Sequence, residues 1–410
     1  MKILFVNQFY WPDMAATAQQ MTDLCEYLAE RGHEVRVVCS RGQYDDGSGR
    51  STPKRETRRG VRIHRLRAPS FGKKSNLGRV IDYAGFHLLV GLWLLVFGWR
   101  YRAIVTLTTP PLIGIYPLLL KWLSFGKVRQ VSWVMDLHPD LEFDLGLWSR
   151  KHPLYATFYW LNNLHFRHVT ATVALGESMA KRIRAKRVKP ERLHVISVWN
   201  RADEVKPMPP GSSPLLAEHG LAGKFVVMYS GNAGIIHDFD AVCEAMKRLS
   251  QDQRVHFLFV GAGLRLKEVR QFVDDQGLQN FTQLPYFPRA QLDASLAMGD
   301  VHLVTLRAGM SGVAVPSKTY GIMAAARAVV YVGPDDSDTA HHIEAGACGY
   351  VIQLNDVDTL VATIRDLADN PAHAAQLGQS GRDYFFKHHE MSVCCGQWAE
   401  LLESLDGSPS

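Results

Sequence analysis

The sequence is poor in cysteine, and no cysteine stands in a metal-binding pattern. Its 410 residues include six cysteines, scattered without a Cys-x-x-Cys pair or a Cys/His cluster. This distribution argues against a zinc site and against a disulfide framework, and it predicts reduced structural thiols in a cytosolic protein. The opening apolar run Met1–Val6 is too short for a secretory signal peptide, so we expect a buried first strand there.

Two further signals are missing. The turn after the first strand carries Ala15 and Ala16 in place of a glycine pair, which excludes a dinucleotide-binding fingerprint there. The apolar run 84–99 falls short of the roughly 20 apolar residues that a membrane-spanning helix needs. The second apolar run, 104–125, contains a proline pair that suits the end of a strand better.

These apolar runs still have the most unusual composition of the chain. They are rich in Leu, carry Trp93, Trp99 and Trp122, and are flanked by Arg and Lys. We favour a helical patch, 84–125, that lies in the membrane interface, over core-facing helices and over a true span. The patch predicts a cytoplasmic protein held peripherally on the inner face of the cell membrane.

Overall composition is that of a globular protein with two domains. Hydrophobic residues make up 47% and charged residues 21%, which excludes wholesale disorder. The net charge of +6 is too small for a dedicated nucleic-acid binder. It suits an anionic ligand or an anionic membrane surface.

Strand and helix patterns alternate along the whole chain and break once. The break is residues 205–214, which contain four prolines and predict a linker. We therefore predict an α/β protein with two doubly wound Rossmann-like domains, 1–204 and 205–390, and a last helix at 391–410. The polar stretch 41–60 is predicted to be a long loop, and a cleft between the domains is the expected ligand site.

The stretch 310–333 organises the second domain. A loop ends in Val315-Pro316-Ser317-Lys318, a helix of small residues follows, and then comes an apolar strand. Ser317 is a predicted helix N-cap, and Lys318 adds a positive charge to the free N–H groups of the first turn. The combination predicts a diphosphate cradle at the carboxyl edge of a parallel sheet, with an ordinary αβ unit as the alternative.

Several segments resemble the family 4 glycosyltransferases, and together they cover nearly the whole chain. They are Phe9–Pro12, Leu28–Val35, Tyr229–Asn232, Phe259–Gly263, Val315–Ala325 and Cys348–Ile352. The last two are most similar to the branch of colanic-acid and other exopolysaccharide transferases. The resemblance implies a GT-B fold of two facing domains and retaining transfer from a UDP- or GDP-sugar without a metal or other cofactor. It also implies a final helix that packs back on the first domain.

The resemblance implies a lipid-linked or saccharide acceptor on the first domain and the donor on the second. Expected donor-binding residues are Gly231, Asn232, Gly234, His237, Gly261, Gly263, Pro316, Ser317, Lys318 and Tyr320. Lys318 and Arg265 are expected to stabilise the leaving diphosphate, because such charge stabilisation is a large catalytic term. The chain departs from the family at Val313 and Gly321, where many members carry two glutamates.

Polar residues after strands of the first domain predict the acceptor side. His138 stands between Asp136 and Asp140 and is a candidate to bind the transferring sugar or to accept a proton. Asp13 and Thr17 are expected to face the cleft from the first loop. Surface-loop roles are the alternative for each. Competing functions are a nucleotide-sugar epimerase of the same fold and a non-catalytic nucleotide-sugar-binding protein.

Overall fold

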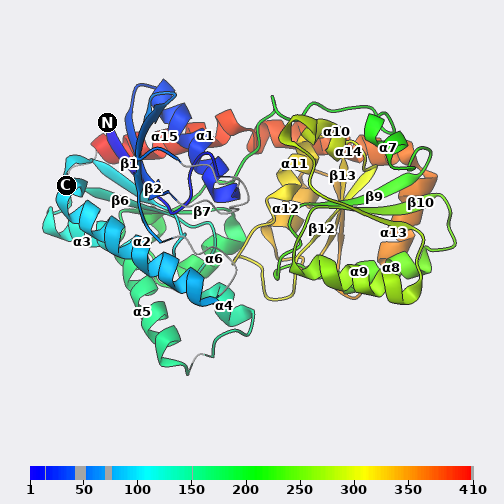
Figure 1. Cartoon of the computed structure of the whole chain (residues 1–410), viewed down its shortest axis with the longest axis horizontal. Coiled ribbons are helices and arrows are strands. Elements are labelled where there is room, and N and C mark those ends of the chain that lie inside the picture. The colour runs from blue at the N-terminus through cyan, green and yellow to red at the C-terminus, as the bar shows by residue number, and fades with distance from the viewer. Residues whose placement is uncertain (14, 42–51, 70–75, 150, 408–410) are drawn as a thin grey trace. The chain divides into compact units, whose positions relative to one another are not determined.

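The computed structural model describes the chain except residues 14, 42–51, 70–75, 150 and 408–410. The chain folds into two compact α/β units (Figure 1). Unit 1 contains Met1–Val198 and Cys394–Ser410, and unit 2 contains Trp199–Val393. The division falls ahead of the proline-rich stretch that the sequence suggested as a linker. That stretch belongs to unit 2, where Val205 is buried and the Met208 carbonyl accepts a hydrogen bond from Arg327.

The sheet of unit 1 has eight strands in the order β3-β4-β2-β1-β5-β6-β7-β8. All neighbours are parallel except β3 and β4. The strands are β1 Lys2–Val6, β2 Glu34–Ser40, β3 Arg55–Arg58, β4 Val61–Leu66, β5 Ala103–Thr106, β6 Arg129–Trp133, β7 Ala171–Ala174 and β8 Leu193–Val195. Residues 42–51 of the predicted loop 41–60 lie outside the described part of the chain, and strand β3 corrects the end of that prediction. The charged residues of β3 gave no apolar signal, but the tight turn at Arg59 and Gly60 pairs it with β4.

Helices cover both faces of this sheet, as the alternating pattern predicts. They are α1 Ala16–Glu30, α2 Asn76–Phe97, α3 Ile115–Leu123, α4 Asp140–Asp144, α5 Pro153–His168 and α6 Glu177–Ala185. A last helix, α15 Met391–Gly407, adds its residues from Cys394 onward to the same unit. There Trp398 is fully buried against Trp133, with ring centroids 4.7 Å apart.

Helix α2 is longer than the apolar run 84–99 indicated. It has 22 residues and begins at Asn76, ahead of that run. Among the described residues, one segment, Val80–Arg100, has the length and hydropathy of a membrane span, and 33% of it is buried. Phe86, Val90 and Leu94 are fully buried against the sheet, so one side of α2 belongs to the core of unit 1.

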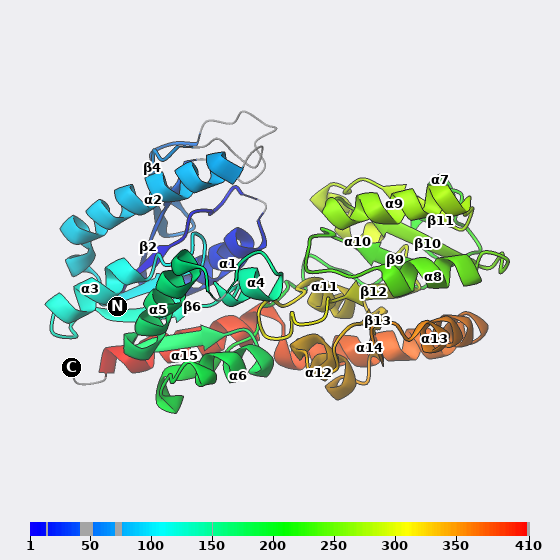
Figure 2. The same ribbon diagram turned by 90° about the horizontal axis from the view of Figure 1, so that it is seen from below.

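The other side of α2 is an apolar stripe open to solvent. It consists of Leu88, Leu92, Leu95 and Val96, together with Trp99 of the following turn, each 46–64% exposed. Helix α2 packs against α3, and α3 packs against α5 (Figure 2). These neighbours add exposed apolar side chains, namely Trp122, Leu123, Phe125 and Trp160. We call this set of residues the apolar surface of unit 1.

The sheet of unit 2 has six parallel strands in the order β11-β10-β9-β12-β13-β14. They are β9 Phe225–Ser230, β10 Val255–Val260, β11 Phe281–Leu284, β12 Val301–Thr305, β13 Ala328–Val332 and β14 Gly349–Ile352. The helices are α7 Pro214–Glu218, α8 Asp240–Arg248, α9 Leu264–Gln276, α10 Leu292–Leu296, α11 Lys318–Ala324, α12 Asp338–Ala345, α13 Val357–Asp369 and α14 Pro371–His388. The prediction of two Rossmann-like α/β units is confirmed.

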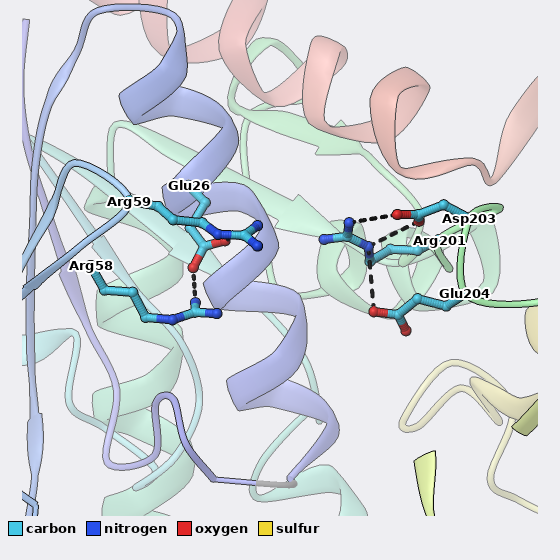
Figure 3. A network of polar contacts seen from close by, with 6 residues as sticks. All are labelled: Glu26, Arg58, Arg59, Arg201, Asp203 and Glu204. Atoms are coloured by element: carbon cyan, nitrogen blue, oxygen red, sulfur yellow. Dashed lines mark hydrogen bonds and ion pairs between the residues drawn. The ribbon is translucent and has the colours of Figure 1, made fainter. Parts of the chain in front are cut away.

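The start of unit 2 is anchored by charge pairs. Arg201 contacts Asp203 at 2.8 Å and Glu204 at 3.4 Å, as Figure 3 shows. Glu204 also pairs with Arg289, which precedes α10. The segment that enters unit 2 is thereby tied to the unit's own helices rather than left as a loose tether.

Candidate functional site

The candidate site of unit 2 lies where the strand order reverses. Strands β9 and β12 are neighbours, but the chain continues from β9 to β10 on one side and from β12 to β13 on the other. Loops that leave such a pair diverge, and the opening at their carboxyl ends is where parallel sheets bind ligands. Tyr229 and Thr305 stand at the ends of these two strands, and His237 follows in the loop after β9.

Lys318 reaches into this opening from the first residue of α11. Its ammonium donates to the Tyr229 hydroxyl and lies 3.7 Å from the centroid of the same ring. It is also 3.4 Å from His237 Nε2. Among the described residues, no carboxylate pairs with Lys318, and burial lowers the pKa of its ammonium well below the usual range. The site therefore holds a lysine side chain without an anionic partner.

His237 is fixed as a neutral acceptor. Its Nδ1 is 2.7 Å from the Thr305 carbonyl, which only accepts hydrogen bonds, so Nδ1 carries the proton. The remaining lone pair, on Nε2, faces the Lys318 ammonium. Burial and the Lys318 charge lower the pKa of His237 to about 3. Both neighbours of Lys318 thus accept hydrogen bonds without neutralising its charge.

Two glycine loops approach each other beside the cation. A Cβ on Gly261 would stand 2.3 Å from the Gly231 carbonyl oxygen, and one on Gly263 would stand 2.3 Å from that of Ala233. Both glycines have positive φ, 134° and 141°. A Cβ on Gly231 would stand 3.6 Å from Lys318 Nζ. These loops leave no room for side chains, so the backbone itself faces the opening.

Four further residues predicted to bind the donor lie in the loop after β9 or just before α11. Asn232 is exposed, and its carbonyl accepts from the Tyr229 hydroxyl at 3.1 Å. Gly234 packs against the Asn232 side chain. Pro316 is buried before the helix. Ser317 stands at the N-cap position but makes no capping hydrogen bond, which corrects the predicted cap: its φ and ψ are helical, so the hydroxyl does not turn back to the first-turn amides.

Tyr320 and Arg265 are not joined to Lys318. The Tyr320 ring is 1% exposed and lies among histidines, 4.5 Å from the His389 ring and 5.9 Å from that of His342. Arg265, in the first turn of α9, pairs with Glu268 and, at 3.7 Å, with Asp240. Its Nε is buried without a hydrogen-bond partner among the described residues.

The two positions at which the chain departs from the expected family pattern differ in their surroundings. Val313 is fully buried, and a carboxylate there would lose its hydration. A Cβ on Gly321 would stand 2.9 Å from the Asn200 side-chain nitrogen. A side chain at position 321 would therefore meet the amide nitrogen of Asn200, which is a hydrogen-bond donor.

His138 of unit 1 forms an ion pair. Its Nδ1 is 2.7 Å from Glu142, one turn further on, in α4. Burial alone would lower the pKa of His138, but the Glu142 hydrogen bond and the charges of Glu142, Asp136 and Asp140 outweigh it and raise that pKa. Burial, and to a smaller extent the Glu142 charge, raises the pKa of Asp136 against the opposing His138 charge.

The other predicted acceptor-side residues are held by local contacts. Asp140 accepts from Lys186 at 2.7 Å, and the Lys186 side chain is 2% exposed. Asp13 is buried after β1, and its carboxylate accepts from the Ala15 amide at 2.8 Å. Thr17 is half-buried in the first turn of α1.

Sequence reasoning missed the partners that shape both sites. Tyr229 and Thr305 define the Lys318 environment, and Glu142 and Lys186 define the charges around His138 and Asp140. Glu142 had a readable signal, because it follows His138 by four residues at helical spacing. Tyr229 had a weaker one, as an aromatic residue just before a glycine loop. The partners Lys186 and Thr305 are distant in sequence and had none.

The geometry of the unit 2 opening suits a diphosphate. A partly desolvated ammonium, backbone amides of glycine loops and a first helical turn are the groups that bind phosphate oxygens. Bound phosphate would restore the full charge of Lys318. Among the described residues, no group of three or more metal-ligating side chains is found.

Comparison with known families and sequences agrees with this chemistry. Residues 16–199 match the family of glycosyl transferase 4-like domains, and residues 224–370 match the glycosyl transferases group 1. The putative colanic acid biosynthesis glycosyl transferase WcaI of Escherichia coli is 25% identical over 385 residues, 91% of this chain and 93% of that one. The probable glycosyltransferase WbjE of Pseudomonas aeruginosa is 26% identical over 271 residues, 66% of this chain and 67% of that one.

Solved structures share the fold over the full length. The sucrose-phosphate synthase of Thermosynechococcus elongatus has a TM-score of 0.78 at 14% identity and covers 100% of both chains. Anabaena HepE, solved in complex with UDP and glucose, has a TM-score of 0.73 at 17% identity, covering 98% of this chain and 100% of its own. These likenesses show the GT-B fold.

Proposed function

The chain belongs to the family 4 glycosyltransferases, and from this premise we propose a retaining, metal-independent transfer of a sugar from a nucleoside-diphosphate sugar. The proposed acceptor is a lipid-linked or saccharide intermediate of cell-surface polysaccharide synthesis. The observation that carries the proposal is the Lys318 ammonium, packed on Tyr229 and His237 without a carboxylate partner among the described residues.

Lys318 has the chemistry to act on the leaving group. As the bond from the anomeric carbon to the diphosphate breaks, negative charge grows on the phosphate oxygen, and a positioned ammonium stabilises it. The same oxygen accepts the proton of the acceptor hydroxyl, whose oxygen bonds to the anomeric carbon on the face that the diphosphate leaves. This route needs no protein nucleophile. The positive charge that stabilises the leaving diphosphate comes from side chains of the protein.

His138 is the proposed hydrogen-bond donor to the transferring sugar. Glu142 holds Nδ1 and keeps the pKa of the ring raised, so Nε2–H remains to donate. A charge-assisted bond of this kind is stronger than a neutral one. Arg265, with its buried Nε, is the proposed second cation for the donor diphosphate.

The donor and acceptor follow from the relatives only by analogy. HepE binds UDP and glucose, which makes a UDP-sugar the first donor to test. The name of WcaI refers to colanic acid, which supports an exopolysaccharide intermediate as acceptor. The apolar surface of unit 1 supports a lipid-linked acceptor and peripheral contact with the inner face of the cell membrane. Since one side of α2 belongs to the core of the unit, we propose that this helix lies on the membrane rather than crossing it.

The test compares Lys318→Met with Lys247→Met, an exposed lysine of α8 in the same unit. With UDP- and GDP-sugars and a lipid-linked acceptor, Lys318→Met should lower the transfer rate by about 10²–10³-fold, the effect of removing one charge-stabilising donor. Lys247→Met should transfer normally. Unchanged transfer by Lys318→Met would refute the assignment, and the anomer of the product, read by NMR, tests retention.

The same assay separates the competing functions. Turnover of the nucleotide sugar without any acceptor would identify an epimerase. Nucleotide binding without turnover of any donor–acceptor pair would identify a non-catalytic binding protein. Activity that survives EDTA is expected if the protein's own cations serve the diphosphate.

A further inference from the structure

Unit 1 contains a cavity that none of these roles uses. Its volume is about 470 Å³. Strands β2, β3 and β4 form one wall, and the end of α2 with the following turn Gly98–Arg100 forms the other. The lining is mostly basic and aromatic, with Arg36, Arg55, Arg62, His64, Trp93, Phe97 and Arg100, and it includes one acidic residue, Glu56.

The cavity lies away from the loops assigned to the acceptor. Arg36 and Arg62 are paired in register near the amino ends of β2 and β4. Asp13 and His138 follow the carboxyl ends of β1 and β6. Because all four strands are parallel within one sheet, amino and carboxyl ends lie at opposite edges. The cavity is therefore a separate feature of unit 1.

The carboxylates in this region, including Glu56 of the cavity lining, already pair with arginines. Glu26 pairs with Arg58 and Arg59 (Figure 3), Glu34 with Arg62, and Glu56 with Arg65. The cavity's other three arginines have no carboxylate partner among the described residues; they are Arg36, Arg55 and Arg100.

The pKa of His64 is affected by the same positive charges. Burial lowers its pKa, and the charges of Arg55, Lys54 and Arg36 lower it further. Its ring stands 5.8 Å from that of Trp93 on α2, inside the cavity wall. A neutral imidazole there adds a hydrogen-bonding group without adding to the repulsion between the arginines.

The cavity wall and the exposed stripe share the carboxyl-terminal end of α2 and the turn after it. Trp93 and Phe97 line it, while Val96 and Trp99, on the adjoining side of the helix and its following turn, are 64% and 46% exposed. Arg100 lies over the Phe97 ring at 5.3 Å and is exposed at the same end. Cations that meet an open apolar helix face match a molecule with a phosphate at one end and hydrocarbon at the other.

We propose that this cavity binds the phosphate headgroup of an anionic phospholipid while the α2 stripe enters the acyl-chain boundary. The inference rests on the proposed membrane contact and adds the lipid class and the residues that select it. The three arginines that lack a carboxylate partner among the described residues supply the charge complementarity, and Trp99 with the leucines of α2 supplies the apolar contact.

The experiment measures flotation of the full chain with vesicles of phosphatidylcholine alone or with 30% phosphatidylglycerol, a content we set at roughly one anionic lipid in three. Wild type should bind the anionic vesicles more tightly. The triple variant Arg36→Gln/Arg55→Gln/Arg100→Gln should lose about a hundredfold in partitioning, since each cation near an anionic surface adds about fivefold. The charge-matched control is Lys206→Gln/Lys247→Gln/Lys387→Gln, three exposed lysines of unit 2, and it should lose less than about threefold.

Arg36 is also hydrogen-bonded to Tyr101, so a second variant protects the test against misfolding. Arg55→Gln/Arg100→Gln leaves that contact intact and should still lose about twentyfold or more. Equal binding of wild type to both vesicle types, or equal losses in the triple variant and its control, would overturn the proposal. So would strong thermal stabilisation of wild type by free glycerol 1-phosphate, because a small soluble phosphate would then be the ligand.

A further readout separates this proposal from the proposed function. Stabilisation by UDP and transfer to a water-soluble acceptor should be unchanged in the triple variant, because the cavity takes no part in donor binding. Loss of flotation with intact transfer supports the headgroup site. Intact flotation in the triple variant refutes it and leaves the transferase assignment untouched.

Discussion

Two lysines of this protein each lie over a tyrosine ring but differ in their charge partner. Lys186 of unit 1 lies over the Tyr159 ring at 4.4 Å, and Lys318 of unit 2 lies over the Tyr229 ring at 3.7 Å. Lys186 also contacts the Asp140 carboxylate at 2.7 Å. Lys318 meets His237 instead, whose neutral imidazole accepts a hydrogen bond but carries no charge.

The difference separates a cation that is paired within the fold from the one that we propose to bind the donor diphosphate. A buried charge is tolerated when a carboxylate and further hydrogen bonds compensate it, as for Lys186. An ammonium that lacks this compensation carries an uncompensated desolvation penalty. Such perturbed groups are typical of ligand-binding and catalytic sites. Tyr229 and His237 orient the Lys318 ammonium without quenching it, so an incoming anion finds its charge available.

The largest effect should come from breaking the compensated pair. Lys186→Met leaves Asp140 beside the apolar ring without its cation, so the free energy of unfolding should fall by about 3–5 kcal/mol. Urea denaturation measures this change. The double variant Lys186→Met/Asp140→Leu removes both charges and should recover most of the loss. A loss below about 1 kcal/mol in the single variant would show that the Asp140 contact is not a structural pair.

Ligand-dependent stability should separate the two lysines next. UDP at about 100 times its dissociation constant should stabilise wild type by about 2.7 kcal/mol. Lys318→Met should lose most of this stabilisation at the same concentration, and Lys186→Met should keep it. Uridine, which lacks the diphosphate, is the control ligand and should affect wild type and Lys318→Met alike. Equal stabilisation of both lysine variants by UDP would remove the distinction.

The sequence sufficed for the architecture because the strands are strongly apolar and follow a regular order. The turn residues of the cradle also placed Lys318 at a strand's carboxyl edge. The predictions missed two short elements, the charged strand β3 and the helix α7, because neither carries a periodic apolar signal. The Ser317 cap failed because the residue type favours a cap while the backbone here is already helical.

The contact partners of the candidate residues could not be predicted from the sequence, for a different reason. The contact of Lys318 with Tyr229, and that of Lys186 with Asp140, join residues far apart in the chain, and no spacing rule reports them. Tyr320 presents a different case, because its place in the sequence was known but its contacts were not. It stands two positions after Lys318 and was predicted to bind donor, but successive helical residues point in different directions, and its ring packs among histidines.

The pH dependence of stability should show the Lys318 penalty directly. Because the pKa of Lys318 is depressed in the folded protein, the unfolded chain binds more protons between that pKa and the ordinary lysine value. Stability of the ligand-free protein should therefore rise with pH in this interval, by at most about 1.4 kcal/mol per pH unit. Thermal unfolding measured against pH should show Lys318→Met more stable at the low end and converging with wild type at the high end. Saturating UDP should abolish the rise, and a rise of equal size in Lys318→Met would assign it to another group.

The smallest effect concerns a third cation, His138, which has a carboxylate but remains partly open to solvent. The Glu142 hydrogen bond and charge outweigh burial and hold the pKa of His138 above its usual value, so the ring stays protonated to higher pH. If the imidazolium donates to the transferring sugar, kcat/KM should decline as the pH rises through this pKa. Glu142→Gln keeps the shape of the side chain but removes its charge, so the decline should begin at lower pH, while the rate on the acidic side stays within about twofold. Glu244→Gln, which alters an exposed pair with Arg248 in unit 2, should leave the profile in place. If Glu142→Gln does not shift the decline of kcat/KM at high pH, His138 does not donate to the sugar. Its pair with Glu142 would then serve the fold, as the pair of Lys186 with Asp140 does.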